Sequence, residues 1–565
     1  MASNASYDVV IRNGLVVDGS GLGSYKADVG IIGATIACIG RIRERGTEEI
    51  DAEGLAVTPG FIDGHTHMDA QIFWDPLGTN SCWHGITSVV MGNCGFTLAP
   101  AKPDRRDLVV RNLERAEDIS PAALAAGVRW SWESFREYLD AVDSTPKAIN
   151  YAGSIGHSAL RTWAMGEAAF ERAATDDELK RMQGEVRDAI EAGAIGFTTS
   201  RSPNHETSDD RPVASRIAPW DEVRSLVGVL GDVGAGFFQL ANESAGRGDD
   251  LVEREAYFDR LRALAAETLV PIVFGVTATR NGFHELGLID DIAQAAGRAF
   301  GLSRCRDISL VHSFRSNLPF DTIEEWKPVR ALPLAEQKAA LRNPAIRARL
   351  LQAVREGRYG RSINPRPAYE RVFYMERPYG ANPSVAELAR ERGVEPAEAM
   401  IDIALETDFA ALFVQPAEYQ EPEKLLKVLR HPRTLMTFSD SGAHVSQISD
   451  CSIQTHFLAE FVRERQLFTL EEAIRMLTLE PALAFGIRDR GLLREGMVAD
   501  LNVMNPATVG PELPEVVHDL PGGAKRLLQK AAGFRATVVG GQVTFREGRH
   551  TGALPGRLLR GPLAS

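Results

Sequence analysis

Two histidines separated by one residue follow an apolar run near the start of the sequence. The segment FIDGHTH, residues 61–67, places His65 and His67 directly after residues typical of a buried strand. In an extended segment, side chains two positions apart lie on the same face, so both imidazoles can bind one cation. A lone histidine is more often structural, but this spacing at a strand end favours a metal site. We therefore predict His65 and His67 as metal ligands.

Two further strand ends carry groups that suit the same cation. Cys94 lies in MGNCGF, residues 91–96, where small neighbours let a thiolate approach a zinc-like ion. Asp440 closes the apolar run 434–439, and its carboxylate can bind a cation or carry a proton from water to a leaving amine. A buried thiol and a helix cap are the ordinary alternatives for these residues. We predict both as ligands, and Asp440 also as the catalytic proton carrier.

The elements that must position these residues are repeated strand–helix units. The middle of the chain alternates short apolar runs with longer helical patterns, which is typical of a parallel sheet. Eight runs favour a closed barrel over an open sheet, and no glycine-rich dinucleotide fingerprint follows the first run. The predicted fold class is α/β, with a (β/α)8 TIM-like barrel. The eight runs are residues 56–62, 86–91, 148–154, 194–199, 236–240, 270–276, 308–312 and 434–439.

Both ends of the chain consist of short apolar segments separated by turns, which is the pattern of a β unit. We expect the two ends to pair as a small β-sandwich domain, formed by residues 1–56 and 491–565. The barrel would then take residues 57–490. Residues 320–361 are rich in Ala, Leu, Glu and Arg, and we expect a helical insertion that is either a lid or a solvated helical pair.

Composition excludes several classes of function. The 565 residues are 44% hydrophobic and 25% charged, as in a globular protein with a sizeable core. Acidic residues outnumber basic ones, 76 to 63, and the formal charge of -13 disfavours nucleic acid and anionic membrane surfaces as partners. No secretion signal or membrane-spanning run occurs, and the odd count of five cysteines suggests reduced thiols. We expect a cytoplasmic enzyme acting on a small molecule.

Taken together, these motifs resemble the amidohydrolase superfamily and, within it, the N-acyl-D-amino-acid deacylase (D-aminoacylase) group. The resemblance covers nearly the whole chain. The cysteine motif is the specific one, because the parent superfamily more often bridges its metals with a carboxylated lysine on the fourth strand, and residues 194–201 contain no lysine. The segments that carry the resemblance are 58–67, 85–96, 156–161, 193–200, 439–440 and 552–560.

The resemblance implies one or two divalent ions, usually zinc, bound by the His-x-His pair, the cysteine and the aspartate. It also implies two histidines at the ends of strands five and six, but the corresponding runs here contain Gln239 and Thr277 and no histidine. Three metal hypotheses follow. The first is a single ion on His65, His67, Cys94 and Asp440; the second is a rebuilt site that recruits Glu243, His157 or His312; the third is a pocket without stable metal.

The reaction that the resemblance implies is cleavage of the amide bond of an N-acylated (D-)amino acid, or a related small amide, by a metal-activated water. His157, after the third run, is predicted to donate to the developing oxyanion, and a structural core histidine is the alternative. The superfamily often forms dimers or tetramers, so a homo-oligomer is expected. Two other hypotheses stay open: a hydrolase or lyase acting on a carbon–carbon, ester or cyclic amide bond, and a non-catalytic ligand-binding barrel.

An acylated amino acid also needs a group that holds its carboxylate and a pocket for its acyl chain. A planar guanidinium suits the first task, and apolar aromatic side chains suit the second. Phe73, Trp74 and Trp83 are the candidates for the acyl pocket. The candidate substrate-binding residues are Arg201, Arg280 and Arg315, with Gln239, Glu243 and His312 as further polar groups.

Overall fold

The computed structural model, described here for residues 6–279, 281–359 and 365–563, centres on a parallel sheet of eight strands. Neighbouring strands follow the order β6, β7, β8, β9, β10, β11, β12, β16, so seven successive strands pair in chain order. The predicted TIM-like barrel is thereby confirmed. The strands are β6 (Phe61–Asp63), β7 (Ile86–Met91), β8 (Asn150–Gly156), β9 (Gly196–Ser200), β10 (Phe237–Ala241), β11 (Ile272–Gly275), β12 (Ala299–Ser303) and β16 (Thr434–Met436).

Helices surround the barrel because each carries one apolar face. In α5 (Asp176–Glu191), Met182, Val186 and Ala189 are spaced three or four residues apart and all are buried. A capping box of Thr175 and Glu178 fixes the first turn of this helix. The remaining helices of the barrel are α1 (Arg106–Glu114), α2 (Pro121–Gly127), α3 (Phe135–Ser144), α4 (His157–Met165), α6 (Trp220–Val233), α7 (Leu251–Thr268), α8 (His284–Gln294), α14 (Pro422–Leu429), α15 (Ile453–His456), α16 (Leu470–Leu477) and α17 (Leu479–Ala484).

The first and last strands of the barrel meet through a short set of hydrogen bonds. Thr437 is fully buried, and its hydroxyl accepts from the backbone N–H of Gly64 (2.6 Å) and donates to the carbonyl of Ile62 (2.9 Å). Beyond it, the backbone N–H of His67 donates to Ser441 (2.7 Å). We call the contact between residues 62–67 and 437–441 the closing seam. It joins the two segments that carry three of the four predicted metal ligands.

The seventh strand was predicted wrongly. It is β12 (Ala299–Ser303), whereas Ile308–His312 forms β13 and pairs antiparallel with β15 (Phe413–Glu418) in a separate three-stranded sheet with β14 (Phe373–Tyr374). Both segments are short apolar runs that end in polar residues. Only the pairing of β12 with β11 and β16 distinguishes them, and that pairing is not visible in the local sequence.

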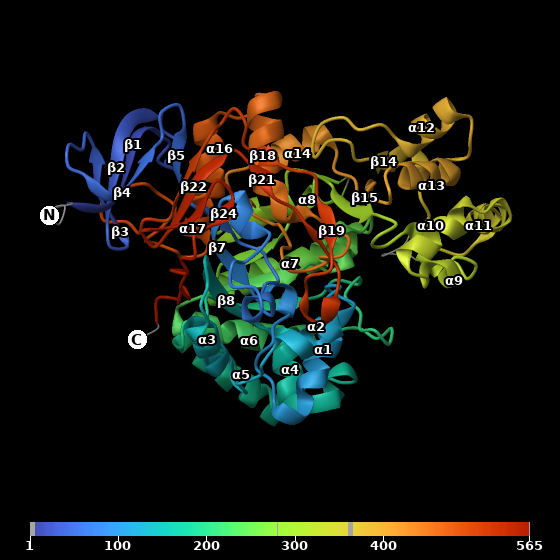
Figure 1. Cartoon of the computed structure of the whole chain (residues 1–565). Helices are drawn as coiled ribbons and strands as arrows, with labels where there is room; N and C mark the ends of the chain where they lie inside the picture. Colours follow the sequence, from blue (N-terminus) through green and yellow to red (C-terminus); the bar gives the residue numbers. More distant parts are fainter. Residues whose placement is uncertain (1–5, 280, 360–364, 564–565) are drawn as a thin grey trace.

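The part of the chain that follows β12 and precedes β16 contains a helical lobe. This lobe has its own apolar core, in which Trp326 and Phe409 are fully buried. Figure 1 shows it, in yellow and gold, on the other side of the molecule from the N-terminal strands. The predicted insertion 320–361 is part of this larger lobe, and its residues 360 and 361 lie outside the described residues. The helices of the lobe are α9 (Lys327–Arg330), α10 (Leu334–Arg342), α11 (Pro344–Glu356), α12 (Val385–Arg392) and α13 (Pro396–Glu406).

Strands from the two ends of the chain pair in one mixed sheet of nine strands, so the expected pairing of the ends is present, and the expected domain bounds stay predictions. β5 lies parallel to β1 and antiparallel to β17, so the N-terminal strands are joined directly to the C-terminal ones. Two-stranded ribbons, β18 (Gly510–Pro511) with β21 (Ala531–Ala532) and β19 (Glu515–Val517) with β20 (Arg526–Leu528), lie outside this sheet. Its strands are β1 (Tyr7–Val16), β2 (Tyr25–Ile32), β3 (Thr35–Gly40), β4 (Gly46–Asp51), β5 (Ala56–Pro59), β17 (Leu501–Met504), β22 (Phe534–Val539), β23 (Gln542–Arg546) and β24 (Arg549–His550).

Among the described helices, none has the length and apolar character that crossing a lipid bilayer requires.

The closing seam makes a prediction about stability. Thr437→Val keeps the size of the side chain but leaves the Gly64 N–H and the Ile62 carbonyl without their buried partner. The free energy of unfolding should fall by about 2–4 kcal/mol, which urea denaturation would measure. Thr47→Val, on an exposed position of β4, is the control and should change stability little. A Thr437 variant as stable as the control variant would contradict the role given to this hydroxyl.

Candidate functional site

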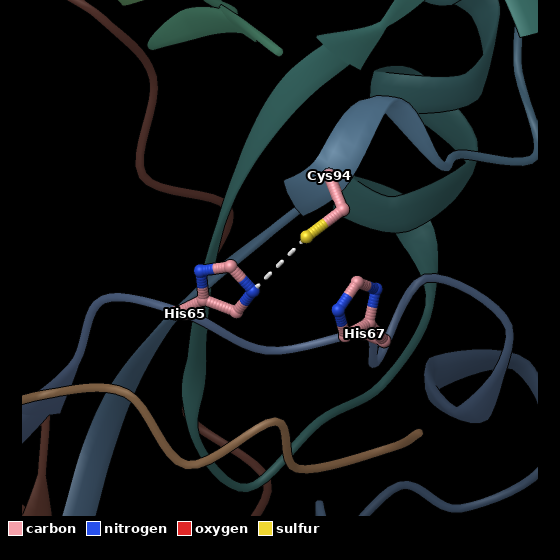
Figure 2. A group of neighbouring side chains, drawn as sticks. All are labelled: His65, His67 and Cys94. Atoms are coloured by element: carbon pink, nitrogen blue, oxygen red, sulfur yellow. Dashed lines mark hydrogen bonds between the residues drawn. The ribbon is translucent and has the colours of Figure 1, made fainter. Parts of the chain in front are cut away.

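Four predicted ligands gather beside the closing seam. One ligand atom from each of His65, His67 and Cys94 lies within 4.8 Å of the others, and all three side chains are buried (Figure 2). The Sγ atom of Cys94 is 3.5 Å from Nε2 of His65. Oδ1 of Asp440 is 3.2 Å from Nε2 of His65 and 3.6 Å from Nε2 of His67. The sequence therefore identified side chains that the fold brings into one cluster.

These side chains fit a divalent cation. Two atoms bound at about 2.0–2.3 Å to one tetrahedral ion lie roughly 3.3–3.6 Å apart, close to the separations of His65 from Cys94 and from Asp440. Both ring nitrogens of His67, although buried, make no hydrogen bond within the described part of the chain. Buried polar groups rarely stay without a partner. Two imidazoles, a thiolate and a carboxylate are also the ligand types that zinc prefers.

A tight turn presents Cys94 to this cluster. Cys94 has a φ of +55°, a left-handed conformation that costs a non-glycine residue about 1–3 kcal/mol. Gly92 precedes it at φ +83°, and a Cβ there would lie 2.1 Å from the carbonyl oxygen of Ser154. The turn is stabilised from the barrel, because the Cys94 N–H donates to the side chain of Gln239 at 2.8 Å. Gln239, predicted to contact substrate, is thus a support of the thiol-bearing turn.

Burial controls the ionisation of His65 and Cys94. Burial would also lower the pKa of His67, but Glu117, Asp440 and Cys94 outweigh burial and raise this pKa well above its usual value. Burial lowers the pKa of His65 to about 4, even though the neighbouring Asp440 raises it. Burial raises the pKa of Cys94 to about 11, even though the neighbouring His67 lowers it. The imidazole of His65 is therefore neutral and able to donate an electron pair at neutral pH. Cys94 is a thiol in the protein alone, and a bound cation would favour its thiolate form.

Arg304, which was not predicted from the sequence, keeps Asp440 in its carboxylate form. The guanidinium of Arg304, 5% exposed, donates to Oδ2 of Asp440 at 2.5 Å and lies 3.9 Å above the ring of Phe438. Burial would raise the pKa of Asp440, but Arg304 and the neighbouring imidazoles of His65 and His67 outweigh burial and lower this pKa well below its usual value. Arg304 follows β12 directly, so the wrong assignment of the seventh strand hid it.

Glu117 and His444 also lie beside the cluster and were not predicted. Oε2 of Glu117 is 3.4 Å from Nε2 of His67 and 3.7 Å from Nε2 of His444. Glu117 follows helix α1 rather than a strand, so no strand-end signal marked it. His444 is four residues after Asp440 in the segment that follows the last strand, and this closeness was the available signal.

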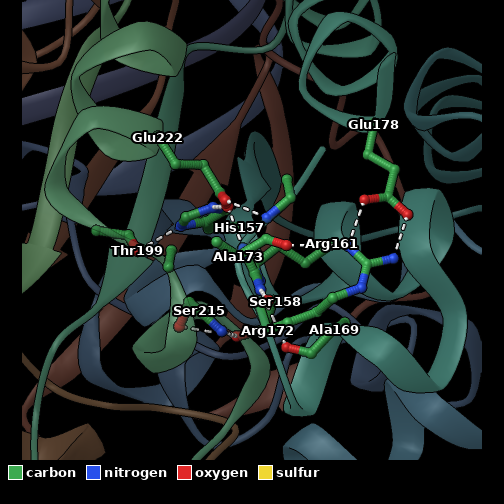
Figure 3. A network of polar contacts seen from close by, with 12 residues as sticks. His157, Ser158, Arg161, Ala169, Arg172, Ala173, Glu178, Thr199, Ser215 and Glu222 are labelled. Atoms are coloured by element: carbon green, nitrogen blue, oxygen red, sulfur yellow. Dashed lines mark hydrogen bonds and ion pairs between the residues drawn. The ribbon is translucent and has the colours of Figure 1, made fainter. Parts of the chain in front are cut away.

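His157 is part of a buried polar network (Figure 3). Its Nδ1 lies 2.8 Å from the hydroxyl of Thr199, and its Nε2 lies 3.0 Å from Oε1 of Glu222, which also pairs with Arg161. Both ring nitrogens therefore have protein partners. This arrangement supports the structural alternative rather than the predicted oxyanion donor.

Glu222 carries the negative charge of this network. Burial would raise the pKa of Glu222, but hydrogen bonds and charges from His157 and Arg161 outweigh burial and lower this pKa to about 2. Burial is the main cause that lowers the pKa of His157. The carboxylate is thus ionised at neutral pH and holds the buried guanidinium of Arg161 in place.

The other predicted residues have partners away from the cluster. Nε of Arg201 lies 3.1 Å from Glu243, which also pairs with Arg260. Arg315 is a partly exposed residue whose guanidinium donates to the carbonyl of Asp408 (2.9 Å). His312, on β13, lies 3.3 Å from the side chain of Gln415. Arg280 lies outside the described residues.

A cavity lined by both apolar and polar residues adjoins Asp440. Trp74, Ile119 and Leu527 line it together with Asp440, Asp450 and Arg526. Of the three aromatic residues predicted to line an acyl pocket, Trp74 is in this cavity, whereas Trp83 lines a different one and Phe73 stacks on Trp132. The cavity therefore offers an apolar wall next to a carboxylate of the cluster.

The chain resembles proteins of one family along nearly its whole length. A family model described as the amidohydrolase family matches residues 48–302 and 328–545. An uncharacterised protein of Mycobacterium tuberculosis is 30% identical, over 98% of this chain and 94% of its own length. D-aminoacylase of Alcaligenes xylosoxydans xylosoxydans is 27% identical, over 98% of this chain and 97% of its own. A solved D-aminoacylase structure, described as having a binuclear metal centre, is 25% identical, with a TM-score of 0.65 and coverage of 98% and 100%.

The His157 network makes a pH-dependent prediction. Glu222→Gln leaves the buried Arg161 without its carboxylate, so the free energy of unfolding at pH 7 should fall by about 3–5 kcal/mol. Because the folded-state pKa of Glu222 is about 2, its contribution is complete above the ordinary value of 4.5 and disappears as the pH falls through about 2. Urea denaturation of the variant and the unmodified protein between pH 7 and pH 3 measures this difference, which should shrink at the acidic end.

Glu167→Gln is the control for that experiment, because Glu167 is an exposed carboxylate that pairs with Arg111 and Arg211. Its effect should stay below about 1 kcal/mol. Equal losses in the two variants, or a loss in Glu222→Gln that is independent of pH, would contradict the assignment.

Proposed function

Because this chain belongs to the amidohydrolase family, we propose that it hydrolyses the amide bond of an N-acyl-D-amino acid with the help of a divalent cation. The observation that carries the proposal is the buried group of His65, His67 and Cys94, in which one ligand atom of each residue lies within 4.8 Å of the others. Oδ1 of Asp440 lies beside both histidines of this group. The similarity to D-aminoacylase over 98% of the chain supports the substrate class. Ligand chemistry favours zinc, because imidazole and thiolate are its common protein ligands.

The four ligands would hold the cation beside the closing seam. A bound divalent cation polarises the scissile carbonyl and lowers the pKa of water, which supplies a nucleophile near neutral pH. The structure supports the single-ion hypothesis, because the other residues considered, His157, Glu243 and His312, all have protein partners. Asp440 is the proton carrier that we propose.

The ion pair with Arg304 determines how Asp440 acts. It holds Oδ2, so Oδ1 is the atom that faces the two histidines. Because Arg304 favours the carboxylate form, Asp440 returns the proton readily to a leaving amine. Arg304 also fixes the orientation of the carboxylate, which reduces the reorganisation that proton transfer requires.

The cavity next to Asp440 is the proposed substrate pocket. Its apolar wall, with Trp74, Ile119 and Leu527, suits an acyl chain, and Asp440 at its edge places the reacting amide beside the cluster. Arg526 is the arginine among the lining residues, but its guanidinium already donates to both carboxylate oxygens of Asp519. A small molecule is the proposed substrate; the cytoplasmic location and the homo-oligomeric state stay predictions.

Removal of metal should abolish the activity. A chelator should lower hydrolysis of N-acetyl-D-amino acids by roughly tenfold or more, and added Zn²⁺ should restore it, because the cation supplies the activated nucleophile. Elemental analysis of the purified protein measures the metal, and a matched panel of N-acetyl-L-amino acids tests the stereochemistry. Cys94→Ala should lose metal, whereas Cys82→Ala, at a buried cysteine beside Phe534, should retain it.

An active protein without bound zinc, iron or manganese would overturn the metal-dependent mechanism. Inactivity on both acyl-amino-acid panels, with turnover of an ester or a cyclic amide, would overturn the substrate class and leave the cation site intact.

Asp440→Asn tests proton transfer separately. The amide keeps the shape of the side chain but cannot accept the proton, so kcat should fall by about 100- to 10,000-fold. Circular dichroism and metal content should show that the variant folds and how much cation it retains. Near-normal kcat in a fully metal-loaded variant would assign the proton transfer to another residue.

A further inference from the structure

The carboxyl group of Glu117 lies against the predicted cation site although no strand end supplies it. Glu117 is 2% exposed, and its Oε2 is 3.4 Å from Nε2 of His67. Nε2 of His444 is 3.7 Å from the same oxygen. A buried carboxylate is costly unless a charge or several hydrogen bonds compensate it. A positive charge beside Glu117 would favour the carboxylate form of this buried side chain.

Hydrogen bonds do not explain this arrangement. Within the described residues, Oε1 of Glu117 has no hydrogen-bond partner, and neither ring nitrogen of His67 has one. The separation of 3.4 Å between Oε2 and Nε2 is long for a charge-assisted hydrogen bond, which is usually about 2.7–2.9 Å. It is close to the roughly 3.3 Å between two atoms bound to one tetrahedral zinc ion. The contact has the dimensions of two ligands that share a cation.

The backbone holds Glu117 in this position. The N–H of His444 donates to the carbonyl of Glu117 at 2.7 Å, and the hydroxyl of Ser446 donates to Asp118 at 2.6 Å. The segment after the last barrel strand therefore carries Asp440 and also anchors the loop that carries Glu117. The two carboxylates are fixed relative to each other by one short stretch of chain.

We propose that Glu117 is a further ligand of the cation bound by His65, His67, Cys94 and Asp440, and that His444 is a positioning residue that orients its carboxylate. This inference rests on the proposed function, because it requires a cation in that cluster. Glu117 would bind through Oε2, the oxygen that faces His67. A second carboxylate raises the affinity for a divalent ion and increases the coordination number from four to five.

The test is metal binding by the full chain, measured with Zn²⁺ and with Co²⁺ as a spectroscopic probe. Glu117→Gln should bind Zn²⁺ at least tenfold more weakly than the unmodified protein. In the Co²⁺ form, the thiolate charge-transfer band from Cys94 should persist in the variant. The visible ligand-field bands should become more intense, because the ion passes from five to four ligands.

Glu185→Gln is the matched control, since Glu185 is a buried carboxylate on α5 that accepts from the backbone of Phe135, away from the cluster. This variant should leave the Zn²⁺ affinity and the Co²⁺ spectrum unchanged. His444→Gln should weaken Zn²⁺ binding less than Glu117→Gln does and should retain the five-coordinate spectrum.

Thermal unfolding with and without Zn²⁺ covers the case in which Glu117→Gln folds poorly. A ligand role predicts a smaller Zn²⁺-induced rise in Tm for the variant, whereas a purely structural role lowers Tm equally in both conditions. Unchanged affinity and an unchanged Co²⁺ spectrum in Glu117→Gln would overturn the inference and leave the proposed function standing. Absence of any Zn²⁺ binding by the unmodified protein would instead overturn both.

Discussion

The site depends on the closing seam, where the ends of the first and last barrel strands meet. The His67 N–H donates to Ser441, and the Asp440 N–H donates to the carbonyl of His65. These two bonds hold side chains that are far apart in the sequence at the separation of two ligands on one ion. Asp440 has a φ of +53°, a costly conformation for a non-glycine residue, and the backbone bonds compensate that cost. The same backbone contacts therefore close the barrel and bring the residues of the site together.

A set of buried ion pairs determines the ionisation of Asp440. Arg304 lies between Asp440 and Asp450, and Arg306 pairs with Asp450 at 3.2 Å, so the buried charges alternate in sign. Stacking of Arg304 on Phe438 limits the directions in which its guanidinium can point. An isolated buried Asp440 would favour the protonated acid, a poor cation ligand. The pairing with Arg304 keeps Asp440 ionised, but it also requires burial of the charged guanidinium of Arg304.

The sequence predicted the parts of the fold and site that local pattern determines. The His-x-His pair, Cys94 and Asp440 follow short apolar runs, and alternation of strand and helix patterns indicated the barrel. The seventh strand was missed because residues 299–303 and 308–312 are both short apolar runs, and only pairing with β11 and β16 separates them. Glu117 and the partners of His157 could not be predicted, because Glu117 meets His67, and Glu222 meets His157, across long stretches of sequence.

The helical lobe has a consequence for synthesis on the ribosome. Because it separates β12 from β16, the chain must extend through the whole lobe before the last strand can close the barrel. At about 5–20 residues per second, roughly 20–70 s pass between the emergence of Cys94 and that of Asp440. During this interval His65, His67, Cys94 and Glu117 are present without Asp440. Early folding of the lobe around its own core would shorten the flexible chain between β12 and β16. The entropy cost of bringing the two edges of the barrel together would then be smaller.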